Sequence, residues 1–183
     1  MTEKTDSPEV ALARRLVQGD QAAMQQFVEL FQRKVFQYTW LMCGHREDAE
    51  EVAQDTLLKV FENWEQLRDP ENIKPWVFRI ARNCCMLKRR KSVFAPSEEL
   101  QIDDVPVESA ADGPDEILLR KEIHAELERA LRTIPENYRS VILLRDVEEM
   151  STAETASLLD ITEDNVKQRL HRGRAMLRKA LAA

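Results

Sequence analysis

Hydrophobic residues recur with the period of an α-helix along most of this chain of 183 residues. Apolar positions three or four residues apart line one face of a helix, whereas alternation at every second position is typical of a strand. The helical period runs through residues 8–42, with an interruption at Gly19 and Asp20, and predicts two helices there. After Gly44 it resumes through residues 47–64. The pattern therefore predicts an all-α fold.

The predicted helix over residues 47–64 has an apolar and a polar side. Its inward side is expected to consist of Val52, Leu57, Val60, Phe61 and Trp64. Its polar side consists of Glu51, Gln54, Asp55 and Lys59. Such a side usually meets only water, but acidic and amide groups held in fixed positions can also dock on a basic partner surface. The pattern alone leaves both interpretations open.

A polar loop and another helix follow. Asp69 and Pro70 stop the preceding helix, so residues 66–74 are expected to form the loop. Pro75 suits the first turn of a helix, because its missing amide would be unpaired there in any case. We therefore expect a helix over residues 75–91. Its core face is expected to consist of Trp76, Val77, Ile80 and Leu87.

Cations and aromatic residues are mixed in this region. Residues 74–91 contain seven Lys and Arg and no Asp or Glu, with Trp76 and Phe78 among them. That mixture suits single-stranded nucleic acid, because bases stack on aromatic rings while phosphates pair with cations. The alternative interpretation is that both aromatic side chains belong to the core and that only the basic end of the helix is exposed.

An acidic segment divides the chain. Residues 92–115 show no sustained helical period and contain three Pro. Residues 92–116 carry eight acids and no base, whereas residues 1–91 and 117–183 each have a net charge of +1, so this segment accounts for the net charge of −6. A low-hydrophobicity, like-charged segment cannot bury enough surface to fold alone. We expect a flexible acidic linker over residues 92–115 between two small helical domains, 1–91 and 116–183.

The C-terminal domain is expected to contain a tight turn between two helices. Helices over residues 116–134 and 136–146 precede it, separated at Pro135. Ser151 and Glu154 then form a capping-box pattern at the start of the next helix. Asp160 follows that helix at the turn, because Asp tolerates the left-handed conformation better than most residues.

The last helix is expected to begin after Thr162, which suits an N-cap. Its buried stripe is predicted to be Val166, Leu170, Gly173 and Leu177. From residue 165 onward it has six Lys and Arg and no acid. A helix-turn-helix places such a helix in the DNA major groove, where Lys, Gln, Asn and Arg hydrogen-bond base edges. Arg172, Arg174 and Arg178, further along, are expected to meet phosphate. The alternative is a solvated basic helix on an α-hairpin, but the cap, turn and stripe together favour a DNA reader.

Several classes of function are disfavoured by composition. Three Cys, at 43, 84 and 85, are too few and badly spaced for a disulfide framework or a zinc site, and Cys84 and Cys85 are expected to be packing residues. The three His stand far apart, at 45, 124 and 171, and no phosphate loop or nucleophile–base pair is found. We therefore expect no enzyme, no metal and no cofactor. The polar N-terminus and the lack of a long apolar run predict a cytoplasmic protein without membrane insertion.

Four stretches in this order resemble the bacterial sigma factors of the extracytoplasmic-function (ECF) type. They are DAEEVAQDTLLKVF, then PWVFRIARN with the following KRRK, then IPENYRSVILLRDVEEMSTAETASLLDI, then NVKQRLHRGRAML. The resemblance runs from about residue 12 to residue 181. It implies that residues 1–91 form sigma domain 2 and residues 116–183 form sigma domain 4, which contains the helix-turn-helix.

The resemblance also implies a role in transcription initiation. Domain 2 would bind core RNA polymerase and melt the −10 promoter element, and domain 4 would read the −35 element. The partners would be promoter DNA, the β′ clamp coiled coil and the β flap of the polymerase, and an anti-sigma factor. Such an anti-sigma factor is often membrane-bound and would then hold the protein at the membrane. By matching position, the residues that would bind the polymerase are Glu51, Gln54 and Asp55.

The resemblance assigns DNA contacts in both domains. Contacts to the −10 element would come from the loop at residues 68–73, which would hold a flipped base, and from the helix that follows it. The residues that would make these contacts are Arg68, Asp69, Asn72, Lys74, Arg79, Arg82 and Asn83. Those to the −35 element would come from Arg145, Thr162, Asn165, Lys167, Gln168, His171 and Arg172. Two other interpretations remain open: a helix-turn-helix regulator that does not act through core polymerase, and a helical scaffold that binds no DNA.

Overall fold

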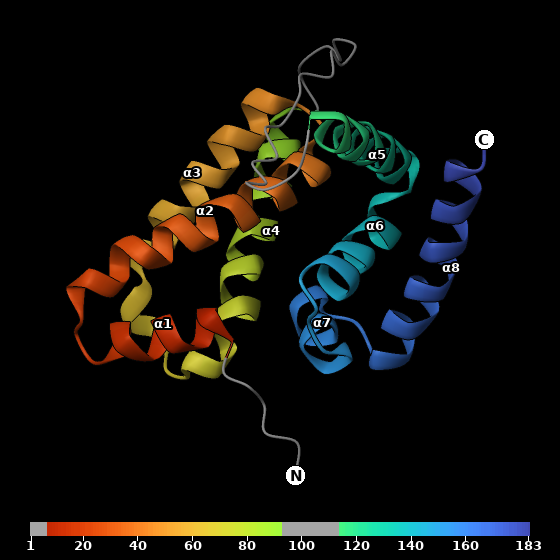
Figure 1. Cartoon of the computed structure of the whole chain (residues 1–183). Coiled ribbons are helices and arrows are strands. Elements are labelled where there is room, and N and C mark those ends of the chain that lie inside the picture. Colours follow the sequence, from red (N-terminus) through yellow and green to blue (C-terminus); the bar gives the residue numbers. More distant parts are fainter. Residues whose placement is uncertain (1–6, 93–113) are drawn as a thin grey trace.

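The computed structural model describes residues 7–92 and 114–183, and these residues form helices joined by short connections, with no strand among them. The N-terminal half consists of α1 (Pro8–Val17), α2 (Gln21–Cys43), α3 (Arg46–Glu62) and α4 (Ile73–Ser92), with the 3₁₀ turns η1 (Trp64–Gln66) and η2 (Pro70–Asn72) between the last two. The C-terminal half consists of α5 (Pro114–Thr133), α6 (Glu136–Ile142), the π-helical turn η3 (Leu143–Val147), α7 (Thr152–Leu159) and α8 (Glu163–Leu181). Figure 1 shows the two halves side by side. The all-α prediction is confirmed.

The core of the N-terminal half is built around α2. Its side chains Phe31, Val35 and Tyr38 are buried because α1, α3 and α4 cover different sides of this helix. Phe78 of α4 packs edge-on against Tyr38, with ring centroids 5.4 Å apart, an arrangement that aromatic pairs favour. Phe78 is therefore a core residue and is not available for stacking on bases. Trp76 is partly buried against the same core.

Two predicted inward residues lie outside. Phe61 is 57% exposed and Leu87 is 48% exposed. On α3 the buried stripe is centred on Thr56, with Val52 and Val60 one helical turn to either side, so Phe61 falls beside the stripe. On α4 the buried residues are Val77, Phe78, Ala81, Cys84 and Cys85. In both helices small or weakly polar residues occupy inward positions that the larger apolar ones were expected to fill.

The helix boundaries also differ slightly from those predicted. α4 begins at Ile73, two residues before Pro75, so the proline lies within the first turn and Lys74 belongs to the helix. Ser92 ends α4, and α5 begins at Pro114, so both flanking helices extend into the predicted linker. The remainder of that linker, residues 93–113, lies outside the described residues.

The turn between α7 and α8 has the predicted capping. Ser151 and Glu154 form a reciprocal capping box, and Asp160 adopts the left-handed conformation with φ 55° and ψ 51°. The predicted stripe of α8 faces α6: Val166 and Gly173 are buried, and Leu170 and Leu177 pack against the core. Gly173 is a contact point, since a Cβ there would lie 3.0 Å from Ile142 Cδ1 and 3.3 Å from Tyr138 Cβ. The glycine thus lets the two helices approach closely.

Candidate nucleic-acid and partner interfaces

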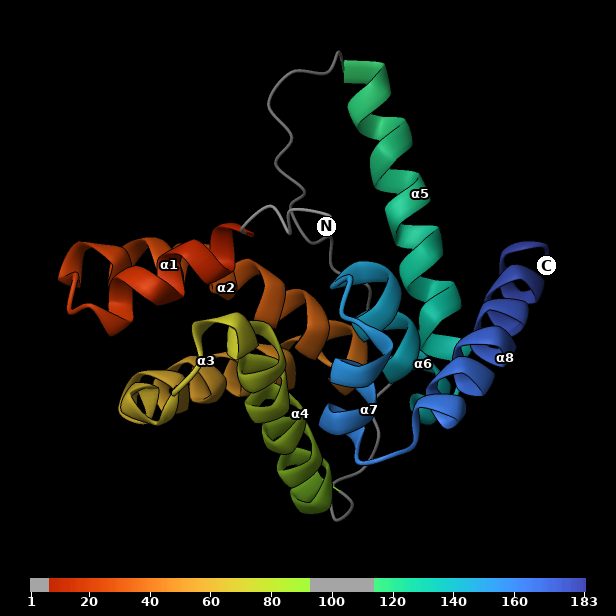
Figure 2. The same cartoon turned by 90° about the horizontal axis from the view of Figure 1, so that it is seen from below.

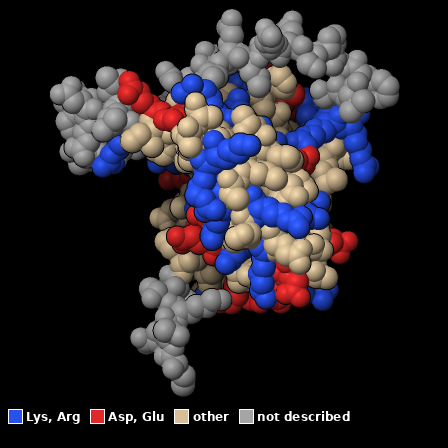
Figure 3. Space-filling view, turned by 90° about the vertical axis from the view of Figure 1, so that its right-hand side faces the viewer, with Lys and Arg blue, Asp and Glu red and all other residues tan. Residues whose placement is uncertain are grey.

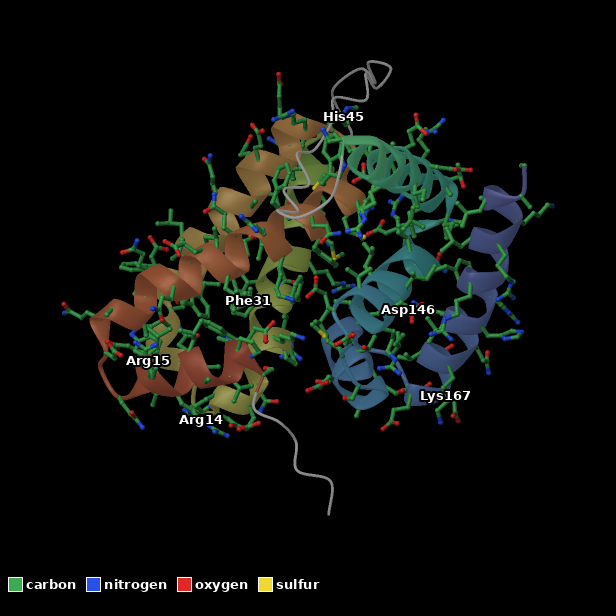
Figure 4. The ribbon with its side chains drawn as sticks, in the orientation of Figure 1. Arg14, Arg15, Phe31, His45, Asp146 and Lys167 are labelled. Atoms are coloured by element: carbon green, nitrogen blue, oxygen red, sulfur yellow. The ribbon has the colours of Figure 1, made fainter. Side chains whose placement is uncertain are left out.

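The N-terminal end of α8 presents polar side chains to solvent. The Thr162 hydroxyl accepts a hydrogen bond from the Asn165 amide at 3.2 Å and so fixes where the helix begins. The exposed predicted −35 residues on this helix are Asn165, Lys167, Gln168, His171 and Arg172. Figure 4 shows Lys167 near this end of α8, at the edge of the molecule. Residue types that hydrogen-bond base edges therefore stand together on one end of an exposed helix.

Arg145 reaches the same place from a different element. It lies in η3, and with Lys167 and His171 it lines a shallow groove of about 320 Å³ along α8. Its Nε is buried and has no hydrogen-bond partner among the described residues. The structure thus brings Arg145 next to Lys167 and His171, although the whole of α7 lies between them in the sequence.

Six Lys and Arg along α8 give this face a positive charge. Figure 3 shows Lys and Arg gathered over it. Arg174 differs from its neighbours, because its guanidinium donates to both carboxylate oxygens of Asp146, at 2.9 and 2.5 Å. Figure 4 shows Asp146 between α6 and α8. Arg174 was expected to meet phosphate, but in this structure its guanidinium ties α8 to η3 although the residue is exposed. Arg172 and Arg178 are exposed as well.

The loop before α4 is shaped by two of its predicted DNA contacts. Asp69 caps η2: its Oδ1 accepts from the Glu71 amide at 3.0 Å, and its Oδ2 accepts from Asn72 Nδ2 at 2.7 Å. Arg68, next to them, is exposed. Asp69 and Asn72 therefore hold the loop in shape, in addition to any contact with DNA.

A cleft of about 500 Å³ opens beside this loop. Arg68 and Asn72 line it from the loop, and Arg79 lines it from α4. The opposite wall comes from the C-terminal half, from residues 153, 154 and 157 of α7. Figure 2 shows α7 next to α4. The place where an unpaired base was predicted to be held is therefore walled on one side by the helix-turn-helix.

Lys74 is also engaged by the C-terminal half. Its Nζ donates to the backbone carbonyl of Glu148 at 2.8 Å. The Glu148 side chain is 3% exposed and pairs with Lys34 at 3.4 Å, and Lys34 in turn lies 3.2 Å from Glu9. Burial raises the pKa of Glu148, although the charge of Lys34 opposes this. Residues from α1, α2 and α4 thus hold the loop between η3 and α7.

The remaining predicted −10 residues differ in their surroundings. Arg79 Nη2 donates to the carbonyl and to the hydroxyl of Ser157, at 3.2 and 3.1 Å. Arg82 is partly exposed and Asn83 is exposed. The structure therefore brings Arg68, Asn72 and Arg79 together at the cleft. Two of the predicted −10 residues, Lys74 and Arg79, contact the C-terminal half.

The predicted docking face of α3 is exposed and partly apolar. Glu51, Gln54 and Asp55 all face solvent. Glu51 bonds Lys88 of α4, and this hydrogen bond lowers the pKa of its carboxyl group. Leu58 continues the same face one turn after Gln54 and is 56% exposed. Leu58 and Phe61 together extend the docking face with apolar surface, which the sequence analysis did not predict. The positions Glu51, Asp55 and Leu58 follow the i, i+4, i+7 spacing of one helix face, so this spacing is a signal that could have predicted the position of Leu58.

The described parts of the chain contain neither a candidate metal site nor a candidate membrane-spanning helix. Residues 7–92 and 114–183 contain no group of three or more His, Cys, Asp or Glu that could hold a metal ion. Within the same ranges no helix is both long and apolar enough to span a membrane.

Comparison with known proteins decides the family. A model described as Sigma-70 region 2 matches residues 27–93, and one described as Sigma-70, region 4 matches residues 124–177. The chain belongs to the sigma-70 family. The first match covers most of α2 through α4, and the second covers the C-terminal half from within α5 to within α8. The predicted family is therefore confirmed.

Similar proteins place this sigma factor in the ECF group. The ECF RNA polymerase sigma factor SigW of Bacillus subtilis (strain 168) is 28% identical over 183 residues, which cover 94% of this chain and 98% of SigW. Sigma factors are DNA-binding regulatory subunits that direct transcription and are not enzymes.

Two solved structures share the fold. The sigma factor RpoE, in complex with the anti-sigma factor NepR from Bartonella quintana, has a TM-score of 0.70 at 21% identity, over 87% of this chain and 96% of that one. CnrH, in complex with the cytosolic domain of CnrY, has a TM-score of 0.66 at 24% identity, over 96% of this chain and 98% of that one.

Proposed function

We propose that this sigma factor binds core RNA polymerase through α3, melts the −10 element with the loop before α4 and with α4, and reads the −35 element with α8. The observation that carries the proposal is the exposed N-terminal end of α8, where the side chains of Asn165, Lys167 and Gln168 project from a capped helix. That is the part of a helix-turn-helix that meets base edges. The basic remainder of the helix supplies sequence-independent attraction to phosphate.

The −10 assignment is supported by the chemistry of the exposed side chains. Arg68 and Asn72 flank the cleft beside the loop, and on α4 Arg82 is partly exposed and Asn83 is exposed. An unpaired base needs a pocket with hydrogen-bonding groups on its edge, and a melted strand needs cations along its path. With Phe78 in the core, Trp76 is the aromatic residue at this cleft.

We further propose that an anti-sigma factor is a partner. The two structural relatives were both solved in complex with a second protein, the anti-sigma factor NepR for RpoE and the cytosolic domain of CnrY for CnrH. Core polymerase is found in the cytoplasm, so a sigma factor that binds it acts there.

The experiment that tests the proposed function is run-off transcription with purified core polymerase. The promoter is first selected from a random DNA library by its binding to core enzyme mixed with this chain. On that promoter, core enzyme supplied with this chain should initiate at a defined start site, and core enzyme alone should not. A helix-turn-helix regulator that does not act through polymerase would bind DNA in the same assay yet give no defined transcript.

The contacts between the halves lead to a prediction about DNA access. Ser157 faces Arg79 across the interface, so Ser157→Lys should repel the guanidinium and favour opening, whereas Ser157→Glu should attract it and favour closure. Exposed pairs of this kind contribute about 0.2–1 kcal/mol. Binding of the free factor to a single-stranded −10 oligonucleotide, measured by fluorescence anisotropy, should therefore become up to several-fold tighter for the lysine variant and weaker for the glutamate variant.

The same two substitutions at Asn137 are the matched control, because that side chain is exposed on α6. They change the net charge equally and should shift the affinity less. Equal shifts at both positions would show that the effect is general electrostatic attraction and that the interface does not restrict access to DNA.

A further inference from the structure

The three cysteines of the chain lie together at the end of α2 and the middle of α4. Cys43 is the last residue of α2, and Cys84 and Cys85 follow one another on α4. All three are free thiols. The Sγ atoms of Cys43 and Cys85 are 3.4 Å apart, although the two residues are 42 positions apart in the sequence. Cys84 points elsewhere, and its sulfur accepts a hydrogen bond from Lys59 of α3 at 3.5 Å.

We propose that Cys43 and Cys85 form a redox-active thiol pair, which a hydroperoxide oxidises to an intramolecular disulfide bond between α2 and α4. The two sulfurs are already in contact, and a disulfide requires them to close to about 2.05 Å, so each has to move by less than about 1 Å. Cys43 is the last residue of α2, which ends at Gly44 with φ 85°, and helix ends fray more readily than helix interiors.

The surroundings give the two thiols different roles. Cys43 is partly exposed, whereas Cys85 is 2% exposed, so an oxidant in solution reaches Cys43 first. The hydrogen bond with Cys85 lowers the pKa of the Cys43 thiol, and the Arg89 guanidinium acts in the same direction against burial. A low-pKa, accessible thiol beside a second thiol is the arrangement of reactive cysteine pairs. Cys43 is therefore the attacking thiol and Cys85 the resolving thiol.

Further charges and a hydroxyl group surround the pair. Arg89 donates to the carbonyl of Met42 at 2.5 Å, and it also bonds Glu136 of α6. Asp48 and Lys88 lie close enough to Cys43 to influence its charge. The Tyr38 hydroxyl is buried near both thiols and has no hydrogen-bond partner among the described residues. The site thus lies where α2, α4 and the C-terminal half meet.

The reaction balances with hydrogen peroxide as the oxidant. The Cys43 thiolate attacks one peroxide oxygen, so an S–O bond forms, the O–O bond breaks, and the departing hydroxide takes up a proton as water. Cys85 then gives up its proton and attacks the sulfenic acid sulfur, so the S–S bond forms and the S–O bond breaks. The second hydroxide leaves with that proton as water. Two thiols are oxidised, and one peroxide is reduced to two waters.

The test is thiol counting on the reduced full-length chain before and after treatment with hydrogen peroxide. In denaturant the number of titratable thiols should fall from three to one in the wild type. Digestion without reductant should yield the peptide with Cys43 joined to the peptide with Cys84 and Cys85, lighter by two hydrogens, and dithiothreitol should separate them.

Variants distinguish the pair from its neighbour. Cys84→Ser is the matched control, because Cys84 is adjacent to Cys85 but bonds Lys59, and this variant should still form the crosslink. Cys43→Ser and Cys85→Ser should not form it, and circular dichroism checks that each variant is folded. Formation of the crosslink in Cys85→Ser, its loss in Cys84→Ser, or intermolecular dimers as the main product would each overturn the proposal.

Discussion

Replacing Gln168 by Ala should relax the choice of base at one or two positions of the −35 element. Gln168 is exposed near the N-terminal end of α8, where side chains of a recognition helix reach base edges. Loss of a good contact to a base costs about 1–3 kcal/mol at the preferred sequence. The preferred −35 duplex should thus bind roughly 5- to 150-fold more weakly, while variants at the contacted position lose less.

Arg178→Ala is the matched comparison for this result. Arg178 is exposed on the same helix but about three turns further along, where phosphate contacts are expected. Its loss should weaken all sequences about equally and lower the slope of log affinity against log salt by about one. Binding measured at several salt concentrations, against a set of single-base variants of the duplex, separates the two. If Gln168→Ala weakened all sequences uniformly, α8 would not be reading bases at that position.

Replacing Leu58 and Phe61 by Ser should sharply weaken binding to core polymerase. Both side chains are more than half exposed beside Gln54 and Asp55, so their burial would be available to a partner. Apolar anchors at the centre of an interface commonly contribute 2 kcal/mol or more when truncated, so the affinity should fall by at least about 30-fold. The stability of the chain should change by no more than about 0.5 kcal/mol, because exposed substitutions act weakly on folding.

Leu87 and Ile123 provide the control for the docking face. They are 48% and 55% exposed and belong to α4 and α5, not to α3. Changing both to Ser removes a similar amount of exposed apolar surface and should leave core affinity unchanged. The polar half of the face can be tested separately with Gln54→Ala combined with Asp55→Ala, which should also weaken core binding. Unaltered affinity in both double variants would place the polymerase interface elsewhere.

Local patterns predicted the capped elements of the C-terminal half correctly. The capping box at Ser151, the left-handed Asp160 and the N-cap Thr162 each depend only on residues within four positions of themselves, so a local sequence pattern is enough to predict each of them. The buried stripe of α8 was predictable for the same reason. The assignment of −10 and −35 roles rests instead on resemblance to a family, and it stays a prediction until DNA binding is measured.

The sequence could not predict which side of a helix its neighbours cover. Phe61 and Leu87 are as apolar as the core residues, but α3 and α4 bury other residues, among them Thr56 on α3 and Ala81 and Cys85 on α4. Nor could it predict the pairing of Arg79 with Ser157 or of Lys74 with Glu148, because these contacts join segments more than 70 residues apart. The Cys43–Cys85 contact arises in the same way, from the packing of two helices whose relative position no local pattern specifies.

The division of DNA recognition between the two halves is tested most directly by run-off transcription on two forms of one promoter. One form is fully duplex, and the other has its −10 element already melted. With core polymerase, Asn83→Ala should impair initiation on the duplex form and be rescued on the melted form, because Asn83 stands exposed on α4, where strand opening is proposed. Gln168→Ala should impair both forms equally. Rescue of Gln168→Ala by the melted promoter, or no rescue of Asn83→Ala, would contradict the account.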